Sequence, residues 1–76
     1  MSPVVEVDAR GHRCPVPTLR LRRALQAAAA GSEVRLLADD PMARVDVPHF
    51  ASEAGAELVA VDELAGGGWA FRVRKC

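Results

Sequence analysis

The stretch "DARGHRCPVPTLRLRRAL", residues 8–25, decides the fold because it joins a strand to a helix through one cysteine and two prolines. Cys14 stands between a valine-rich run and a segment of good helix formers, and Pro15 and Pro17 follow it directly. Proline is tolerated in the first turn of a helix because the N–H that it lacks would be unpaired there. The prolines therefore predict the start of a helix, with Cys14 as its N-cap residue.

Periodicity and turn residues predict two helices and four strands. Gly31 is expected to end the first helix, whereas Asp46 caps the second, with Pro48 in its first turn and Gly55 at its end. The expected strands are residues 4–9, 33–39, 56–63 and 69–75, and the expected helices are residues 17–31 and a shorter one within 38–55. The order βαβαββ predicts an α/β fold, a two-layer sandwich with a four-stranded mixed sheet and two helices on one face.

The connections also predict how the strands run. Strand–helix–strand connections make the first three strands parallel, and a glycine-rich hairpin then reverses the chain. Cys76 follows the fourth strand, so we expect it at the opposite end of the sheet from Cys14. A strand of five or six residues spans about 17–20 Å, whereas a disulfide needs Cα atoms within about 7 Å. We therefore expect an exposed Cys76 that forms no disulfide with Cys14 in one chain.

The composition is that of an ordinary globular domain. Of the 76 residues, 50% are hydrophobic and 26% charged, and ten basic residues balance ten acidic ones. We expect a single domain, residues 1–76. No segment has the roughly 18 apolar residues of a membrane span or the pattern of a signal peptide. These features predict a cytoplasmic protein, a monomer when free, with no nucleic-acid or membrane partner.

Arginines surround Cys14. Half of the basic residues of the chain lie within residues 10–23, with no acid among them: Arg10, Arg13, Arg20, Arg22 and Arg23. Nearby cations and a helix N-terminus both lower the pKa of a thiol, so we expect Cys14 to titrate below the ~8.5 of free cysteine. Two interpretations of Cys14 stay open on this evidence, a reactive nucleophile and a small buried side chain.

Other polar side chains point less clearly to chemistry. His12 either tunes the thiol, ligates a metal or is an exposed loop residue, and two lone residues make no metal site, so we expect no metal. Asp39 and Asp40 are either acid–base groups or turn caps, and the second interpretation is preferred. We assign no role to His49.

Two motifs make the chain resemble the TusA/SirA-like family of small sulfur-carrier proteins over about residues 5–75. They are Cys-Pro-x-Pro at 14–17 and Ala-Asp-Asp-Pro at 38–41, and they lie within "VDARGHRCPVPTLRLRRAL" and "GSEVRLLADDP". A third matching segment is "DVPHFASEAGAELV". The resemblance implies the same βαβαββ sandwich.

The resemblance also implies a chemistry and a site. Sulfane sulfur is received as a persulfide on Cys14, which makes the chain a sulfurtransferase that relays sulfur and needs no cofactor. Pro15 and Pro17 shape this site. The second motif supplies three residues whose role we leave unassigned: Asp39, Asp40 and Pro41.

Partners follow from the same resemblance. The expected donor is a cysteine desulfurase or a rhodanese-type protein, and the sulfur passes to an acceptor protein. The family's routes end in tRNA thiolation, molybdenum cofactor or sulfur oxidation. Because a carrier presents its sulfur to partners, we expect a docking surface of four arginines: Arg10, Arg13, Arg20 and Arg23. Val16, His12 and Ala51 stand where branches of the family carry other residues, so the branch and its partners stay open.

Two other functions stay open on the residues alone. One is a nucleic-acid-binding or regulatory module that uses the arginine-rich helix, which zero net charge and an aromatic content of 4% disfavour. The other is a thiol redox sensor in which Cys14 is the oxidisable residue.

Overall fold

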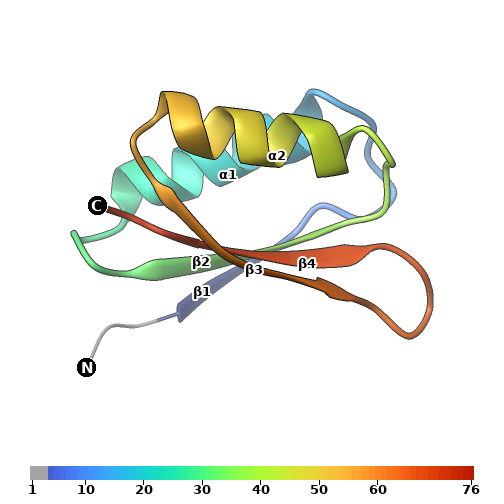
Figure 1. Ribbon diagram of the computed structural model, residues 1–76. Helices are drawn as coiled ribbons and strands as arrows, with labels where there is room; N and C mark the ends of the chain where they lie inside the picture. Colours follow the sequence, from blue (N-terminus) through green and yellow to red (C-terminus); the bar gives the residue numbers. More distant parts are fainter. Residues whose placement is uncertain (1–3) are drawn as a thin grey trace.

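Two helices lie side by side on one face of a four-stranded sheet in the computed structural model, which describes residues 4–76 (Figure 1). The expected domain includes residues 1–3, which lie outside the described part. The elements in chain order are β1 (Val4–Asp8), α1 (Val16–Ala27), β2 (Glu33–Ala38), α2 (Ala43–Glu53), β3 (Glu57–Glu63) and β4 (Trp69–Arg74). The predicted α/β class and the βαβαββ order are confirmed.

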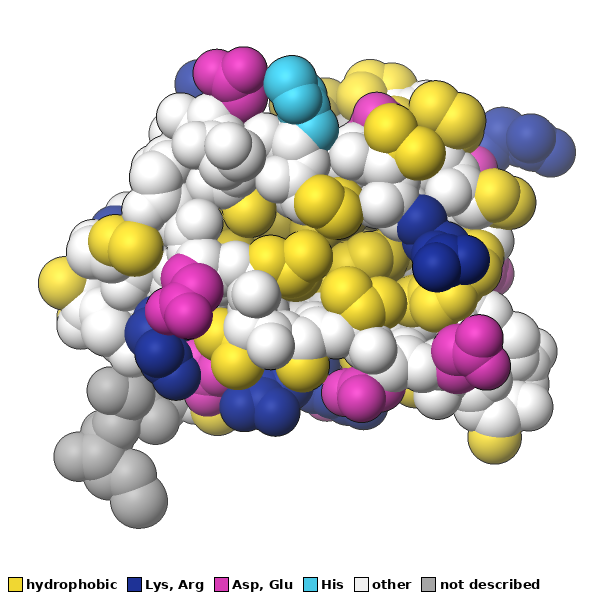
Figure 2. Space-filling model, in the orientation of Figure 1, with side chains coloured by type: hydrophobic (Ala, Val, Ile, Leu, Met, Phe, Trp, Pro, Cys, Tyr) yellow, Lys and Arg dark blue, Asp and Glu magenta, His cyan; other side chains and the backbone are white. Residues whose placement is uncertain are grey.

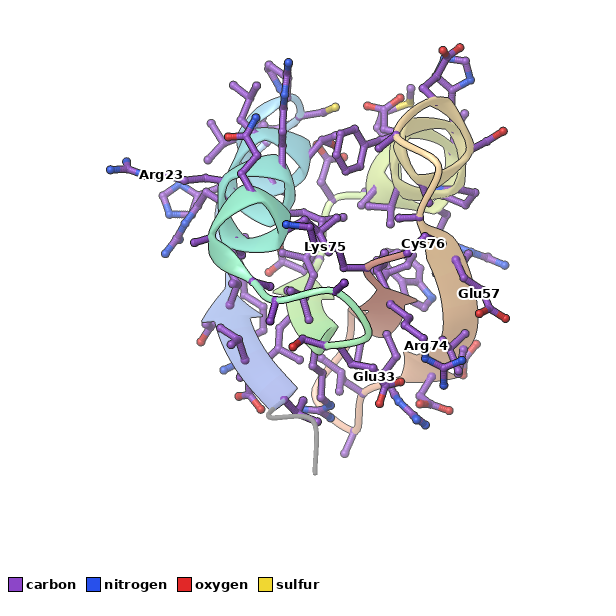
Figure 3. The ribbon with its side chains drawn as sticks, turned by 90° about the vertical axis from the view of Figure 1, so that its left-hand side faces the viewer. Arg23, Glu33, Glu57, Arg74, Lys75 and Cys76 are labelled. Atoms are coloured by element: carbon purple, nitrogen blue, oxygen red, sulfur yellow. The ribbon has the colours of Figure 1, made fainter. Side chains whose placement is uncertain are left out.

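The sheet has the strand order β1-β2-β4-β3. β1 and β2 are parallel, and β4 is antiparallel to both of its neighbours, so β3 runs in the same direction as β1 and β2. Glu33 pairs with Arg74, which places the end of β4 beside the start of β2. Cys76 therefore lies at the end of the sheet opposite Cys14, both thiols are free and Cys76 is exposed, as predicted (Figure 3).

The core lies between the helices and the inner face of the sheet. Alternate strand residues point inward because side chains of a strand alternate between its faces. The helices add residues spaced by four positions, which lie on one helical stripe. The fully buried members include Leu21, Val34, Leu36, Val47, Phe71 and Val73. Hydrophobic side chains remain visible between α2 and the strands in front, so the core is thin at the β3 edge (Figure 2).

Ion pairs cover the outer face of the sheet, away from the helices. Glu33, Glu57 and Arg74 lie on this side of the molecule (Figure 3). The pairs and their N–O distances are Arg35–Glu6 at 2.9 Å, Arg72–Glu33 at 3.2 Å and Arg74–Glu57 at 3.2 Å. Two of these pairs are exposed and add little stability, whereas the Glu33 side chain is only 17% exposed.

The first helix ends earlier than predicted, at Ala27 rather than at Gly31. Ala28 already has an extended backbone, and the Lys75 ammonium donates a hydrogen bond to its carbonyl at 2.7 Å. Gly31 has a φ of 85° but lies in the turn toward β2. A lysine from the far end of the chain thus satisfies a carbonyl at the helix end, which the local sequence could not show.

The second helix begins earlier than predicted, and Asp46 is not its cap. The N-cap residue is Met42, which makes no side-chain capping hydrogen bond, and Asp40 Oδ1 accepts a hydrogen bond from the Met42 N–H at 3.1 Å just before the helix. Pro48 consequently lies inside the helix, where it removes one backbone donor. Asp46 occupies the first turn instead, and its side chain is free to contact another part of the molecule.

Candidate functional site

Cys14 lies where the two helices begin. Because β1 and β2 are parallel, the helices that follow them start at the same end of the sheet. The loop after β1 carries Cys14, which is partly buried. The N-cap of α1 is Pro15, one residue later than predicted, and Pro17 falls in the first turn as expected. The thiol therefore lies beside the N-terminal turns of both α1 and α2.

The two aspartates of the second motif hold the cysteine loop. Asp40 Oδ2 accepts a hydrogen bond from the Cys14 N–H at 2.6 Å, and Asp39 Oδ1 accepts one from the Gly11 N–H at 3.0 Å. Hydrogen bonds from the backbone N–H groups of Cys14 and Met42 lower the pKa of Asp40. The hydrogen bond between Asp40 and Met42 is a turn contact of the expected kind, whereas Asp39 binds the cysteine loop. They tie the loop after β1 to the loop after β2, where Pro41 opens the turn into α2.

Carboxylates, rather than arginines, are the charges closest to the sulfur. The Cys14 Sγ–H donates a hydrogen bond to Asp46 Oδ2. This hydrogen bond, partial burial and the negative charges of Asp46 and Asp40 raise the pKa of Cys14 to about 11, and the neighbouring Thr18 hydroxyl opposes the rise. The expectation of a pKa below that of free cysteine is therefore wrong. The acids, distant in sequence, outweigh the helix N-terminus and the arginines.

Two of the predicted docking arginines, Arg10 and Arg20, meet at Asp8. Arg10 binds the Asp8 carboxylate with two nitrogens, at 2.9 and 2.8 Å, and Arg20 donates to the Asp8 carbonyl at 2.8 Å. Arg23 projects from α1 on the side away from α2 (Figure 3). Arg13 is exposed and acts on the pKa of Asp40 through its charge. The arginines thus lie along the β1 side of α1 and in the loop before it.

The histidines lie on the surface of the molecule. His12 is exposed in the cysteine loop, and His49 lies on α2, 3.6 Å from Glu53. Within residues 4–76 no three or more His, Cys, Asp or Glu side chains are grouped so as to hold a metal ion. Neither helix of this part of the chain is long and apolar enough to cross a membrane.

Asp46 is the site residue that the sequence interpretation assigned wrongly. Once α2 is known to begin at Ala43, the buried stripe is Ala43, Val47 and Ala51. Asp46 and Phe50 then fall on the neighbouring stripe, which faces α1. The signal was present in the spacing, but it depends on where the helix starts, which is at Ala43.

The comparisons with known proteins agree with this geometry. The family model described as sulfurtransferase TusA matches residues 5–75. The chain belongs to the TusA family. The sulfur carrier protein TusA of Allochromatium vinosum is 37% identical over 70 residues, which is 92% of this chain and 91% of the relative. The sulfur carrier protein TusA of Pseudomonas putida is 37% identical over 65 residues, which is 86% of this chain and 81% of the relative.

A solved structure shows the same fold. The crystal structure of a SirA-like protein from Desulfitobacterium hafniense superimposes with a TM-score of 0.82 at 27% identity, covering 92% of this chain and 95% of the other. The resemblance to the TusA/SirA-like family is thus confirmed. Together these relatives make the chain a sulfur carrier of the sulfurtransferase class, which works between a sulfur donor and a sulfur acceptor.

Proposed function

We propose that the chain carries sulfane sulfur as a persulfide on Cys14 Sγ and relays it from a donor protein to an acceptor protein. The observation that supports this is the position of Cys14. It is the cysteine of the Cys-Pro-x-Pro motif, it is partly exposed at the start of α1, and Asp40 of the second motif holds its backbone. Two motifs far apart in the sequence therefore converge on one thiol.

The transfer needs only cysteine chemistry. The Cys14 thiolate attacks the outer sulfur of the donor persulfide, the bond between the two donor sulfurs breaks, and the donor cysteine leaves as a thiolate. Discharge repeats the step with an acceptor thiolate attacking the outer sulfur on Cys14. No electrons are gained or lost overall, so neither a cofactor nor a metal takes part. A free thiol carrier requires a reducing compartment, which favours the cytoplasm.

The partners follow from the family chemistry. A cysteine desulfurase or a rhodanese-type protein supplies the persulfide, and the acceptor belongs to tRNA thiolation, molybdenum cofactor synthesis or sulfur oxidation. Pro15 and Pro17 shape the site by restricting the backbone on either side of Val16. Asp39, Asp40 and Pro41 position the loop that carries the thiol.

Mass spectrometry of the intact protein tests this function. After incubation with a cysteine desulfurase and cysteine, the reduced protein should gain the mass of one sulfur atom, and Cys76→Ser should gain it equally. Cys14→Ser should gain nothing. Loading that persists in Cys14→Ser would overturn the assignment. Salt-sensitive RNA binding without a sulfur adduct would instead support a nucleic-acid function, and a sulfenic acid adduct alone would support a redox sensor.

A further inference from the structure

Among residues 4–76, no cation forms an ion pair with the carboxylate that contacts the thiol. This carboxylate is that of Asp46, which accepts the hydrogen bond of the Cys14 thiol. Arg10 is bound to Asp8, and Arg44 lies over the Trp69 ring, 5.5 Å from its centre. A carboxylate beside a reactive sulfur, left without a countercharge, is unusual because both groups would be stabilised by a cation.

A groove next to this carboxylate has the shape and charge for a basic side chain. It measures about 290 Å³ and lies between α1 and α2. Pro15 and Phe50 provide apolar walls, and Asp46 and Glu53 provide acids. Lysine and arginine combine an apolar stem with a charged head, so they match a groove of this kind. His49 and Thr18 complete its lining.

We propose that Asp46 is a positioning residue that keeps the Cys14 thiol protonated until a docking partner places a lysine or arginine against its carboxylate. This inference rests on the proposed function, and it assigns a chemical property to the partner, a basic side chain next to the sulfur that is transferred. The charges that face the sulfur support it. Asp46 on α2 and Asp40 from the loop after β2 are both negative, and Arg13 of the cysteine loop acts on Asp40 through its charge.

In this proposal, the Cys14 thiol loses its proton only when the partner cation is bound. When the partner cation binds the carboxylate, the Cys14 thiol releases its proton to solvent, and the thiolate attacks the outer sulfur of the donor persulfide. The sulfur–sulfur bond of the donor breaks, and its thiolate takes up a proton. Overall, the Cys14 thiol and the donor persulfide become a Cys14 persulfide and a donor thiol. Away from a partner the sulfur stays protonated and reacts slowly with small electrophiles.

Thiol reactivity tests the first half of the proposal. In a Cys76→Ser background, iodoacetamide alkylation is followed from pH 7.5 to 11 with and without Asp46→Asn. Removing the charge should lower the midpoint of the pH profile and raise the rate at pH 7.5 about tenfold or more, because one pKa unit changes the thiolate fraction tenfold. Asp46→Glu keeps the charge and should behave like the parent. Asp62 is exposed on β3, and Asp62→Asn removes the same charge as Asp46→Asn. This control should leave the pH profile unchanged.

Charged disulfides test the second half. The parent should exchange severalfold faster with cationic cystamine than with anionic dithiodiglycolate, and salt or Asp46→Asn should reduce this preference. Equal rates with both reagents in the parent at low salt would overturn the cation requirement. This comparison uses only the parent protein, so it does not depend on whether a variant folds. An alkylation midpoint that is the same in Asp46→Asn and the parent would overturn the control of the thiol by Asp46.

None of these measurements uses a sulfur donor. If they fail while Cys14 still gains sulfur from a desulfurase, the role of Asp46 is wrong and the proposed function stands. If Cys14 gains no sulfur while Asp46→Asn still shifts the profile, the proposed function is wrong and the control of the thiol by Asp46 is retained as a property of the folded chain.

Discussion

Cys14 reacts as a thiolate, and the groups around its sulfur determine how strongly the proton is held. The hydrogen bond to Asp46 and the two negative charges raise the pKa to about 11, above the ordinary value near 8.5. The folded state thus binds the thiol proton more tightly than the unfolded state does. This contribution to stability is present in full below about pH 8.5 and is lost as the pH rises through the folded pKa.

We predict that the stability advantage of the chain with Cys14 over Cys14→Ala is larger at pH 8 than at pH 11. The change should be small, because a solvent-accessible group interacts weakly with its neighbours. Urea unfolding of both proteins, under reducing conditions and in a Cys76→Ser background, gives the free energy of unfolding at each pH. The same advantage at both pH values would contradict the raised pKa.

At the scale of the elements, the β3–β4 hairpin reaches the loop that supports the site. Gly68 has a φ of 87°, and a Cβ added to it would lie 2.8 Å from the Ala38 carbonyl oxygen and 3.0 Å from the Asp39 Cβ. Asp39 holds the N–H of Gly11 in the cysteine loop. The hairpin therefore packs directly against the second motif, which in turn holds the cysteine loop.

We predict that Gly68→Ala lowers the melting temperature by roughly 5–15 °C. An alanine in the left-handed region costs about 1–2 kcal/mol, and each kcal/mol corresponds to about 4–8 °C in a domain of this size. The close contact with the Ala38 carbonyl adds to this cost. Gly66→Ala is the matched control, because nothing lies within 4 Å of its added Cβ. Equal melting temperatures for the two variants would show that the hairpin tip does not pack as described.

At the scale of the whole molecule, the charges are arranged by face. The outer face of the sheet carries paired charges, whereas Arg20 and Arg23 line the side of α1 next to Val7 of β1. Paired charges cancel at a distance, but Arg23 is exposed on α1 and projects from the helix (Figure 3). A partner that approaches the helix N-termini would meet this flank of α1 as well as the groove beside Asp46.

We predict that replacing Arg20 and Arg23 by glutamate slows sulfur loading from a desulfurase severalfold at low salt. Complementary charge mainly speeds encounter, so the difference should shrink as salt increases. The control is Arg35→Glu with Arg74→Glu on the outer face, which changes the net charge by the same amount. Loading rates that fall equally in both double variants would attribute the effect to net charge rather than to docking on α1.

The order of the elements, the direction of each strand and the position of Cys14 before the first helix could all be predicted from the sequence alone. These follow from local rules: alternation in the strands, helix-forming residues between them, and prolines that begin a helix. The opposite positions of Cys14 and Cys76 follow from the same strand directions. The sequence motifs also indicated the family, because both lie in short segments with fixed spacing.

The helix limits and the chemistry of the thiol depend on contacts that form only when the chain folds. Lys75 satisfies the Ala28 carbonyl at the end of α1, and Asp40 accepts the Met42 N–H just before α2. Both helix limits differ from the local expectation. The start of α2 at Ala43 also leaves Asp46 inside the helix, turned toward α1 and the Cys14 sulfur. Electrostatic effects on a thiol depend on distance in space, and 32 residues separate Asp46 from Cys14 along the chain. The nearby arginines in the sequence therefore predicted the wrong sign, because folding pairs Arg10 with Asp8 and places a carboxylate on the sulfur instead.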